Sequence, residues 1–199
     1  MNTIRLARHS DAIAILGIYA PYILNTSFTF ETEVPTIAAF EQRIISYLED
    51  WPWLVCEIDG VLSGYAYATR HRERAAYQWC VESSVYIHDN FQQRGVAGAL
   101  YAALFEILKY QGCRNVYAGI TLPNDKSVAF HKRFGFTWFA DYKNVGYKLG
   151  QWNTVSWWQL QLNDYSDNPV APVKFSFIDN AFPDVFYEKS KLIKAVLSL

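Results

Sequence analysis

The sequence predicts a mixed α/β fold, in which helices lie on the faces of a β-sheet. Strand-like segments are followed by segments whose apolar residues recur at helical spacing, the pattern of a sheet covered by helices. Apolar residues make up 51% of the 199 residues, and 13 Phe, 14 Tyr and 7 Trp supply bulky side chains for a core. This composition excludes disordered and collagen-like chains, and the length suits one domain with an appended tail.

The first quarter of the chain predicts one short strand and two helices. Thr3–Leu6 reads as a strand, and Ser10 or Asp11 is a suitable N-cap for the helix that follows. Pro21 is expected to kink or end that helix. A second helix is expected from Thr36 to about Leu48. The apolar positions expected on the buried faces are Ile13, Leu16, Tyr19, Ala20 and Ile23 in the first helix and Ile37, Phe40, Ile44, Ile45 and Leu48 in the second.

The middle of the chain predicts a hairpin and an amphipathic helix. Trp53–Ile58 and Val61–Thr69 flank an Asp-Gly pair, which adopts the positive φ angles of a tight turn. Tyr77–His88 contains further extended chain. Val96–Gln111 has a clear apolar stripe, and the glycine that follows it, Gly112, is a common helix stop.

The next segment predicts three more strands and a short helix. Asn115–Ile120, Phe136–Tyr142 and Ser156–Leu162 are strand-like, and Asn124–Phe134 is helical with Gly135 as its stop. Together with the earlier elements, these predict a mixed sheet that carries helices on its faces.

The composition changes after residue 162, which predicts a main domain over 1–162 and an extension over 163–199. Asn163–Pro172 holds two aspartates, two prolines and an Asn-Pro step, and it reads as a linker. The rest is apolar again and is expected to end in a short helix over Tyr187–Leu199. Its apolar side chains are expected to dock on this domain or on a partner copy rather than lie in solvent: Phe175, Phe177, Ile178, Phe182, Phe186 and Tyr187.

Charge and cysteine content narrow the class of protein further. The net charge of −1 provides no global field that would attract a nucleic acid. Cys56, Cys80 and Cys113 are widely spaced, so they indicate neither a disulfide framework nor a metal site, and a reduced cytoplasmic location is expected. The uncharged run Ala12–Leu24 is too short to span a bilayer and lacks the small residues of a signal-peptide cleavage site.

A candidate anion site lies between the extended run that ends at His88 and the helix that starts at Val96. The segment is Gln92-Gln93-Arg94-Gly95-Val96-Ala97-Gly98. The start of a helix presents unpaired N–H groups, and small residues there let a pyrophosphate approach the backbone. Arg94 adds a charged donor. The alternative is an ordinary helix start that contains glycine.

These residues resemble a known family. Gln92-x-x-Gly95-x-Ala97 is similar to the Q/R-x-x-G-x-G/A signature of the GNAT superfamily of acyl-coenzyme A N-acyltransferases, with alanine in place of the last glycine. The run from Asn124 to Phe136 resembles the late helix of that superfamily. The chain also resembles the phosphinothricin N-acetyltransferase group over Ile4–Leu162. The motifs that carry this resemblance are Glu82-Ser83-x-Val85-Tyr86-Ile87, Leu122-Pro123-Asn124-Asp125-x-Ser127, His131 and Gly146-x-Lys148-x-Gly150-x-Trp152.

The resemblance implies a mostly antiparallel sheet in which two strands diverge to admit acetyl-CoA, whose extended arm pairs with free backbone groups. It implies a set of cofactor contacts in three places. Val85, Tyr86 and Ile87 are the strand residues implied to pair with the cofactor arm. The turn implied to hold the pyrophosphate consists of Gln92, Gln93, Arg94, Gly95, Val96 and Ala97, and Asn124 and Ser127 are implied to contact the other side of the arm. No metal is implied.

The resemblance also implies two catalytic residues. Glu82 matches the family glutamate and is the candidate general base, since an α-amino group is mostly cationic at neutral pH. His131 is the candidate acid for the departing thiolate. Taken without the motif, Glu82 is a solvated charge, and His131 has the alternative role of orienting the substrate only. His9, His71 and His88 lack metal-ligand spacing and read as surface or local hydrogen-bonding residues.

The residues that bind the amine substrate are expected in the segment that precedes Glu82 in the sequence. Arg72, Arg74 and Tyr77 match a basic and aromatic loop that binds the acidic end of an amino-acid-like substrate in this group, and arginine suits bidentate contact with a carboxylate or phosphinate. The alternative is a solvated basic loop. Phe28 and Phe30 either line the substrate site or belong to the core.

The resemblance therefore implies N-acetylation of a small amino-acid analogue of the phosphinothricin, methionine sulfoximine or methionine sulfone type by acetyl-CoA. Two alternatives stay open: acetylation of a polyamine or a protein N-terminus, and a non-catalytic acyl-CoA-binding module. A homodimer is also expected. Trp152, Trp157 and Trp158 lie where the resembling family forms dimers, and the two adjacent tryptophans must point to opposite faces of a strand.

Overall fold

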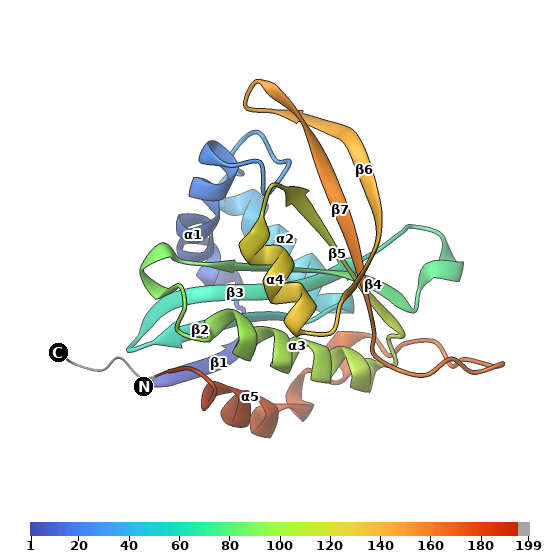
Figure 1. The fold of residues 1–199 in the computed structure, drawn as a ribbon. Coiled ribbons are helices and arrows are strands. Elements are labelled where there is room, and N and C mark those ends of the chain that lie inside the picture. The colour runs from blue at the N-terminus through green and yellow to red at the C-terminus, as the bar shows by residue number, and fades with distance from the viewer. Residues whose placement is uncertain (195–199) are drawn as a thin grey trace.

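The computed structural model describes residues 1–194 as a seven-stranded open sheet with helices on its faces (Figure 1). The strand order is β1-β2-β3-β4-β5-β7-β6, and every neighbouring pair is antiparallel except β4 and β5. The sequence-based fold class is confirmed. The strands are β1 (Asn2–Leu6), β2 (Trp53–Ile58), β3 (Val61–Arg70), β4 (Cys80–Ile87), β5 (Asn115–Leu122), β6 (Thr137–Lys148) and β7 (Gln151–Gln161), and the helices are α1 (Ala12–Asn25), α2 (Ile37–Asp50), α3 (Val96–Gln111), α4 (Asp125–Arg133) and α5 (Pro183–Ser190).

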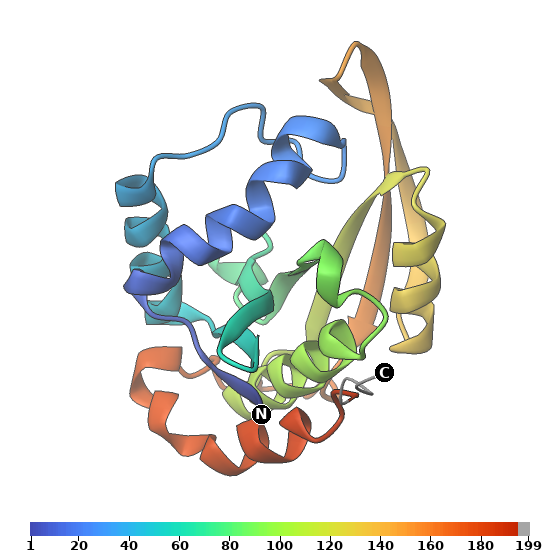
Figure 2. The same ribbon diagram turned by 90° about the vertical axis from the view of Figure 1, so that its left-hand side faces the viewer.

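Two clusters of buried side chains hold the helices to opposite faces of the sheet (Figure 2). Trp53, Val55 and Tyr65 face α1 and α2. Leu54 and Cys56, which alternate with them along β2, face α3. Because side chains alternate across a strand, the continuous apolar run of β2 marks it as a strand that is buried on both faces.

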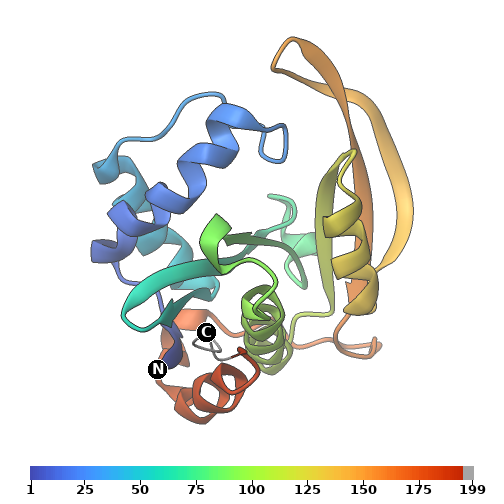
Figure 3. The same cartoon turned by 60° about the vertical axis from the view of Figure 1, so that its left-hand side comes forward.

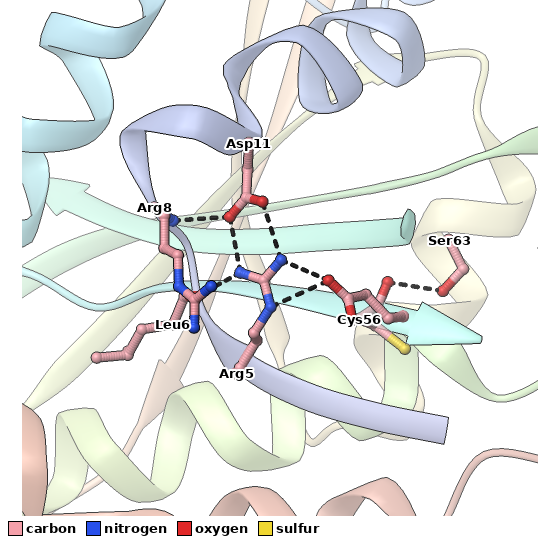
Figure 4. A network of polar contacts seen from close by, with 7 residues as sticks. Arg5, Leu6, Arg8, Asp11, Cys56 and Ser63 are labelled. Carbon is pink, nitrogen blue, oxygen red and sulfur yellow. Dashed lines mark hydrogen bonds and ion pairs between the residues drawn. The ribbon is translucent and has the colours of Figure 1, made fainter. Parts of the chain in front are cut away.

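Arg5 ties the first strand to its neighbours (Figure 4). Its Nη1 and Nη2 donate to the two carboxylate oxygens of Asp11 at 2.7 and 2.9 Å, and its Nε donates to Glu57 Oε1 at 3.0 Å. Burial by itself raises the pKa of Asp11, but the hydrogen bonds from Arg5 and the Arg8 backbone outweigh it and lower the pKa. The contacts join β1 to β2 and to the start of α1.

The first two helices depart from the sequence-based prediction in their details. Pro21 does not end α1, which continues to Asn25, because Tyr19 and Ile23 on either side of the proline are buried against the sheet. Ile13 is 65% exposed, and Ile45 is exposed as well. Adjacent helical residues differ by about 100° in direction, so Ile44 in the core places Ile45 toward solvent. Ile37, at the start of α2, is also exposed.

The last two strands form a longer hairpin than the sequence predicted. They meet at Leu149 and Gly150, whose φ angles of 52° and 79° form a tight turn. The prediction missed the outer half because its aromatic side chains are exposed and show no core-facing alternation. Of the adjacent tryptophans, Trp158 is buried in the core and Trp157 lies on the other face, as expected.

The extension packs on the domain that precedes it (Figure 3). Phe175, Phe182 and Ile193 are buried in the same core cluster as α3. Phe177 and Tyr187 are exposed, so they do not pack on this domain, because a short helix can bury only one face. Docking of these two side chains on a partner copy stays a prediction. The helix of this region covers Pro183–Ser190 instead of the expected Tyr187–Leu199, and residues 195–199 lie outside the described residues. Among residues 1–194, no helix is long and apolar enough to cross a membrane.

Candidate active site

The two parallel strands of the sheet separate halfway along their length. β4 and β5 pair only where Cys80–Glu82 faces Asn115–Tyr117. Beyond this point β4 continues to Ile87 and β5 to Leu122 without a shared register, and Figure 3 shows the two strands leaning apart. One edge of β4 is therefore left without a strand partner, which suits a ligand that binds as an added strand.

The residues expected to contact the cofactor arm lie on this part of β4. Val85, Tyr86 and Ile87 pair with β3 on one side and lie beyond the last pair with β5 on the other. The carbonyl of Ile87 accepts a hydrogen bond from Tyr22 Oη at 2.9 Å. The ring of Tyr86 packs among Tyr19, Tyr22 and Tyr65, so its side chain belongs to the core, and burial raises its pKa.

The predicted anion turn connects β4 to α3. Gly95 is the N-cap of α3 with a φ of +84°, a conformation that glycine adopts without strain. Because glycine has no side chain to cap the helix, the first N–H groups of α3 keep their capacity to bind an anion. Gln92 is hydrogen-bonded to Asp89, and the guanidinium of Arg94 lies over the Phe91 ring. Gln93 has a φ of +62°.

Glu82 and His71 form a hydrogen-bonded pair at the point where the strands separate. Glu82 is the last residue of β4 that pairs with β5, and its side chain is 31% exposed. His71 follows β3, and its Nδ1 lies 2.9 Å from Glu82 Oε1. The His71 ring stacks on Tyr117 with centroids 4.3 Å apart, and its side chain is 12% exposed. The carboxylate is thus held in one orientation while it keeps contact with solvent.

The expected acceptor residues lie around this pair. Nη1 of Arg72 is 3.9 Å from Glu82 Oε1 and donates to the carbonyl of His71 at 3.2 Å. Arg74 and Tyr77 are exposed in the same loop. By contrast, Arg70 lies near Asp50 and Glu73. The loop therefore holds its arginines in different surroundings, and Arg72 is the one next to the candidate base.

The loop between α1 and α2 contacts the tip of the β6–β7 hairpin. Nζ of Lys148 donates to the carbonyl of Thr29 at 2.7 Å, and a Cβ at Gly146 would overlap the ring of Phe30. Phe28 is partly exposed in the same loop. This part of the loop is fixed by contacts with the hairpin, and the aromatic side chains of Phe28 and Phe30 are not core residues.

His131 lies in α4 in a buried network. Its side chain is 5% exposed, its Nδ1 lies 2.8 Å from the carbonyl of Ser127, and its Nε2 lies 3.2 Å from Tyr101 Oη. A carbonyl only accepts, so Nδ1 carries the proton and Nε2 accepts from Tyr101. Tyr101 Oη in turn accepts from Ser83 Oγ at 3.2 Å. Burial lowers the pKa of His131, which favours the neutral form of the ring.

The other two residues expected to hold the cofactor lie at the start of the same helix. Asn124 is the N-cap of α4, and its Oδ1 accepts from the N–H of Ser127 at 3.1 Å. Ser127 Oγ lies 3.3 Å from His131 Nδ1. Asn124 and Ser127 are therefore connected through His131 and Tyr101 to Ser83, the neighbour of Glu82.

Sequence reasoning overlooked two contacts of this site. It treated His71 as a surface or local hydrogen-bonding residue, and it did not assign its partner, which is the candidate base. It also did not assign Tyr101, which links α3 to α4. The sequence signal that was available is the position of His71 directly before Arg72 at the end of a strand. Tyr101 lies on the apolar stripe of α3, where a tyrosine looks like any core residue.

The fold and the diverging strands are those of an acyltransferase, and the match to a family model makes this definite. Residues 4–157 match the model described as the acetyltransferase (GNAT) domain. The chain belongs to the GNAT family of acetyltransferases and is an acyl-CoA-dependent N-acetyltransferase.

Individual relatives place the chain within that family. It is 37% identical to a phosphinothricin N-acetyltransferase of Streptomyces viridochromogenes over 85% of this chain and 93% of the relative. It is 34% identical to an L-methionine sulfoximine/L-methionine sulfone acetyltransferase of Salmonella typhimurium, over 82% and 96% of the two chains. An acetyltransferase structure from Salmonella typhimurium with its cofactor acetyl-CoA covers 86% of this chain and 99% of its own, at 30% identity and a TM-score of 0.81.

Proposed function

We propose that the protein transfers the acetyl group of acetyl-CoA to the amino group of a small amino-acid analogue of the phosphinothricin, methionine sulfoximine or methionine sulfone type. The observation that carries the proposal is the Glu82–His71 pair, which lies where β4 and β5 separate and has Arg72 beside it. The relatives named for these substrates support the substrate class.

In this proposal the cofactor lies along the free edge of β4. Val85 and Ile87 face its arm, the turn from Gln92 to Ala97 holds its pyrophosphate, and Asn124 and Ser127 lie on the other side. The fit is supported by the unpaired edge of β4 and by the open start of α3 at Gly95. The structure of a relative with acetyl-CoA supports the same cofactor.

Glu82 acts as the general base. A cationic α-amino group loses a proton to the carboxylate, and its nitrogen attacks the carbonyl carbon of the thioester. The C–N bond forms as the C–S bond breaks, and the sulfur ends as the thiol of CoA. Of the two protons that the ammonium loses in total, one balances the thiol and the other goes to solvent. His71 donates to Glu82 Oε1 and thereby aims the carboxylate.

The surroundings of His131 favour a positioning role within the protein, which differs from both expected roles, the acid for the thiolate and the orientation of the substrate. Its burial lowers its pKa, and both ring nitrogens are engaged with Ser127 and Tyr101. To protonate the thiolate as a cation, His131 would have to bind a second proton, and its lowered pKa disfavours that form. We therefore assign His131 to holding α4, with Asn124 and Ser127, at a fixed distance from β4.

A panel of amines tests the substrate class. The full-length protein is given acetyl-CoA and phosphinothricin, methionine sulfone, a neutral amino-acid amide or a polyamine, and the free thiol of released CoA is measured. We expect the two analogues that carry an α-carboxylate, phosphinothricin and methionine sulfone, to give the highest kcat/KM. Preference for the polyamine would favour the other enzymatic reading, and the absence of thiol release with any amine would favour a non-catalytic acyl-CoA-binding module.

The loop arginines give a sharper form of the same test. Replacing Arg72 and Arg74 with Gln should raise the KM for the analogues that carry a carboxylate about tenfold or more, because a charge-assisted contact to that carboxylate is lost. The KM for the neutral amide should change by less than about threefold on the same reasoning. Arg70→Gln is the matched control, since Arg70 lies near Asp50 and Glu73. Equal losses on both substrates would contradict the assignment.

We also propose that the protein is a homodimer in which the β6–β7 hairpin contributes to the interface. The hairpin projects beyond the rest of the sheet (Figure 1), and its large apolar side chains are exposed: Trp138, Phe139, Tyr142, Val145, Tyr147, Leu149 and Trp152. Exposed apolar surface of this extent is typical of a contact with another protein surface. Light scattering at micromolar concentration should give twice the 23.0 kDa mass of the chain, and a monomer would contradict the dimer.

A further inference from the structure

The end of the extension touches the turn that the proposed function assigns to the pyrophosphate. The N–H of Lys194 donates to the carbonyl of Arg94 at 3.0 Å. A Cβ at Gly95 would lie only 3.0 Å from the carbonyl oxygen of Leu192. The matched family region ends at residue 157, so these contacts come from a part of the chain outside it. Two residues of the turn are thus contacted by a segment that the family model does not include.

Hydrogen bonds and a buried side chain hold the end of the extension next to this turn. Ser190 Oγ accepts from the N–H of Ile4 at 2.8 Å in β1 and donates to the carbonyl of Phe186 at 2.6 Å. The carbonyl of Ile193 accepts from Asn2 Nδ2 at 3.1 Å, and the Ile193 side chain is buried. Since Leu192 and Lys194 flank Ile193, the buried side chain places both of them against the turn.

The backbone conformation of the turn explains why such a contact would affect ligand binding. Gln93 and Gly95 both have positive φ angles, a backbone conformation that a free peptide samples only in part. When only a fraction of molecules hold the binding conformation, the apparent affinity for a ligand falls by that fraction. A hydrogen bond to Arg94, between the two positive-φ residues, favours the conformation in which the N–H groups of α3 point at one place.

We propose that the extension braces the pyrophosphate turn, so that the backbone contact from Lys194 raises the affinity of the protein for acetyl-CoA. The inference rests on the proposed function, since it concerns the same cofactor site. The brace acts on the turn and not on the chemistry. It therefore affects cofactor binding and leaves kcat at saturating acetyl-CoA and the KM for the amine unchanged.

Lys194 allows the backbone contact to be removed separately from the side chain. Lys194→Pro deletes the N–H donor, and Lys194→Ala keeps it while removing the ammonium group. We expect Lys194→Pro to raise the Kd for acetyl-CoA about fivefold by calorimetry, the range given by one hydrogen bond. The Kd of Lys194→Ala for acetyl-CoA should stay within about twofold of wild type, a change smaller than the loss of one hydrogen bond produces. Equal weakening in both variants would assign the effect to the ammonium group and overturn the brace.

A second pair of variants separates the brace from overall stability. Ile193→Ala removes the anchor next to the turn, and Phe175→Leu removes a comparable buried contact of the extension at the other end of α3. Both should lower the melting temperature, but only Ile193→Ala should raise the Kd for acetyl-CoA. If the Kd rises in both variants, the weaker binding follows from the loss of stability, and the proposed brace is contradicted.

The wild-type protein distinguishes a failure of this inference from a failure of the proposed function. If wild type does not bind acetyl-CoA, the proposed cofactor site itself is wrong. If wild type binds and Lys194→Pro binds equally well, only the brace is overturned. Tighter binding by Lys194→Pro would show that the extension obstructs the turn, which also contradicts the brace.

Discussion

The two sides of the diverging strands hold their histidines in different ways. On the β4 side, His71 contacts a carboxylate that is 31% exposed, with an arginine 3.9 Å from the same oxygen. On the α4 side, His131 is buried, its pKa is lowered, and its partners are the neutral groups Ser127 and Tyr101. A charged, partly solvated group can exchange protons during a reaction, whereas a buried neutral network is suited to holding geometry. The difference supports the proposal that the β4 side carries out the chemistry and the α4 side positions the residues around the cofactor.

The largest effect is expected from removing Glu82, the proposed base. Glu82→Gln keeps the size of the side chain and an oxygen that can accept a hydrogen bond from His71, but it cannot accept the amine proton. We expect kcat to fall by about 10²- to 10⁴-fold, the usual contribution of general base catalysis. The Kd for acetyl-CoA should stay near that of wild type, because the proposal assigns the cofactor contacts to other residues. Turnover close to wild type at pH 7 would remove Glu82 from the mechanism.

A smaller effect is expected from changing His71, which we propose orients the carboxylate of Glu82. His71→Phe keeps an aromatic ring to stack on Tyr117 and deletes the Nδ1 donor to Glu82. We expect kcat to fall about tenfold, since a hydrogen bond to a charged group contributes about 1.5–3 kcal/mol and solvent replaces part of it here. His71→Asn, which offers an amide donor, should recover part of the rate. If all of the loss is in the KM for the amine, His71 binds substrate instead of aiming Glu82.

The smallest effect concerns the stability of the α4 side. The pKa of folded His131 lies below its ordinary value of 6.5, so the unfolded chain binds a proton more readily than the folded chain. The free energy of unfolding should therefore fall as the pH drops below about 6.5, by up to about 1.4 kcal/mol per pH unit. His131→Gln should show a weaker dependence in urea titrations between pH 5 and 7. The matched control is the same change, to Gln, at the exposed His9.

The sequence predicted the elements better than it predicted their extent. Strands and helices were found where periodicity or a turn pair was strong, as in Val96–Gln111 and the hairpin around Asp59-Gly60. The outer half of the β6–β7 hairpin was missed because its aromatic residues face away from any core of this chain. The helix in the extension was placed too late, since Pro183 at its first turn was not used as a start signal.

The candidate site shows a similar limit. The motifs located Glu82, the turn at Gly95 and His131, because each has a local pattern along the chain. The pairing of His71 with Glu82 depends on the register of β3 against β4, in which Thr69 faces Glu82, and the sequence does not state that register. The contact between Lys194 and Arg94 joins residues 100 positions apart, and no local pattern indicates it.

The pH dependence of kcat in His131→Gln tests the division between the two sides most directly. Initial rates of CoA release from saturating acetyl-CoA and amine are measured from pH 5.5 to 9 for wild type and for this variant. If His131 only positions α4, both profiles have the same shape and differ by one constant factor at every pH. If His131 is the acid that protonates the thiolate, the wild-type rate falls as the pH rises through the pKa of His131, and that descending limb is absent from His131→Gln. The second result would contradict the account.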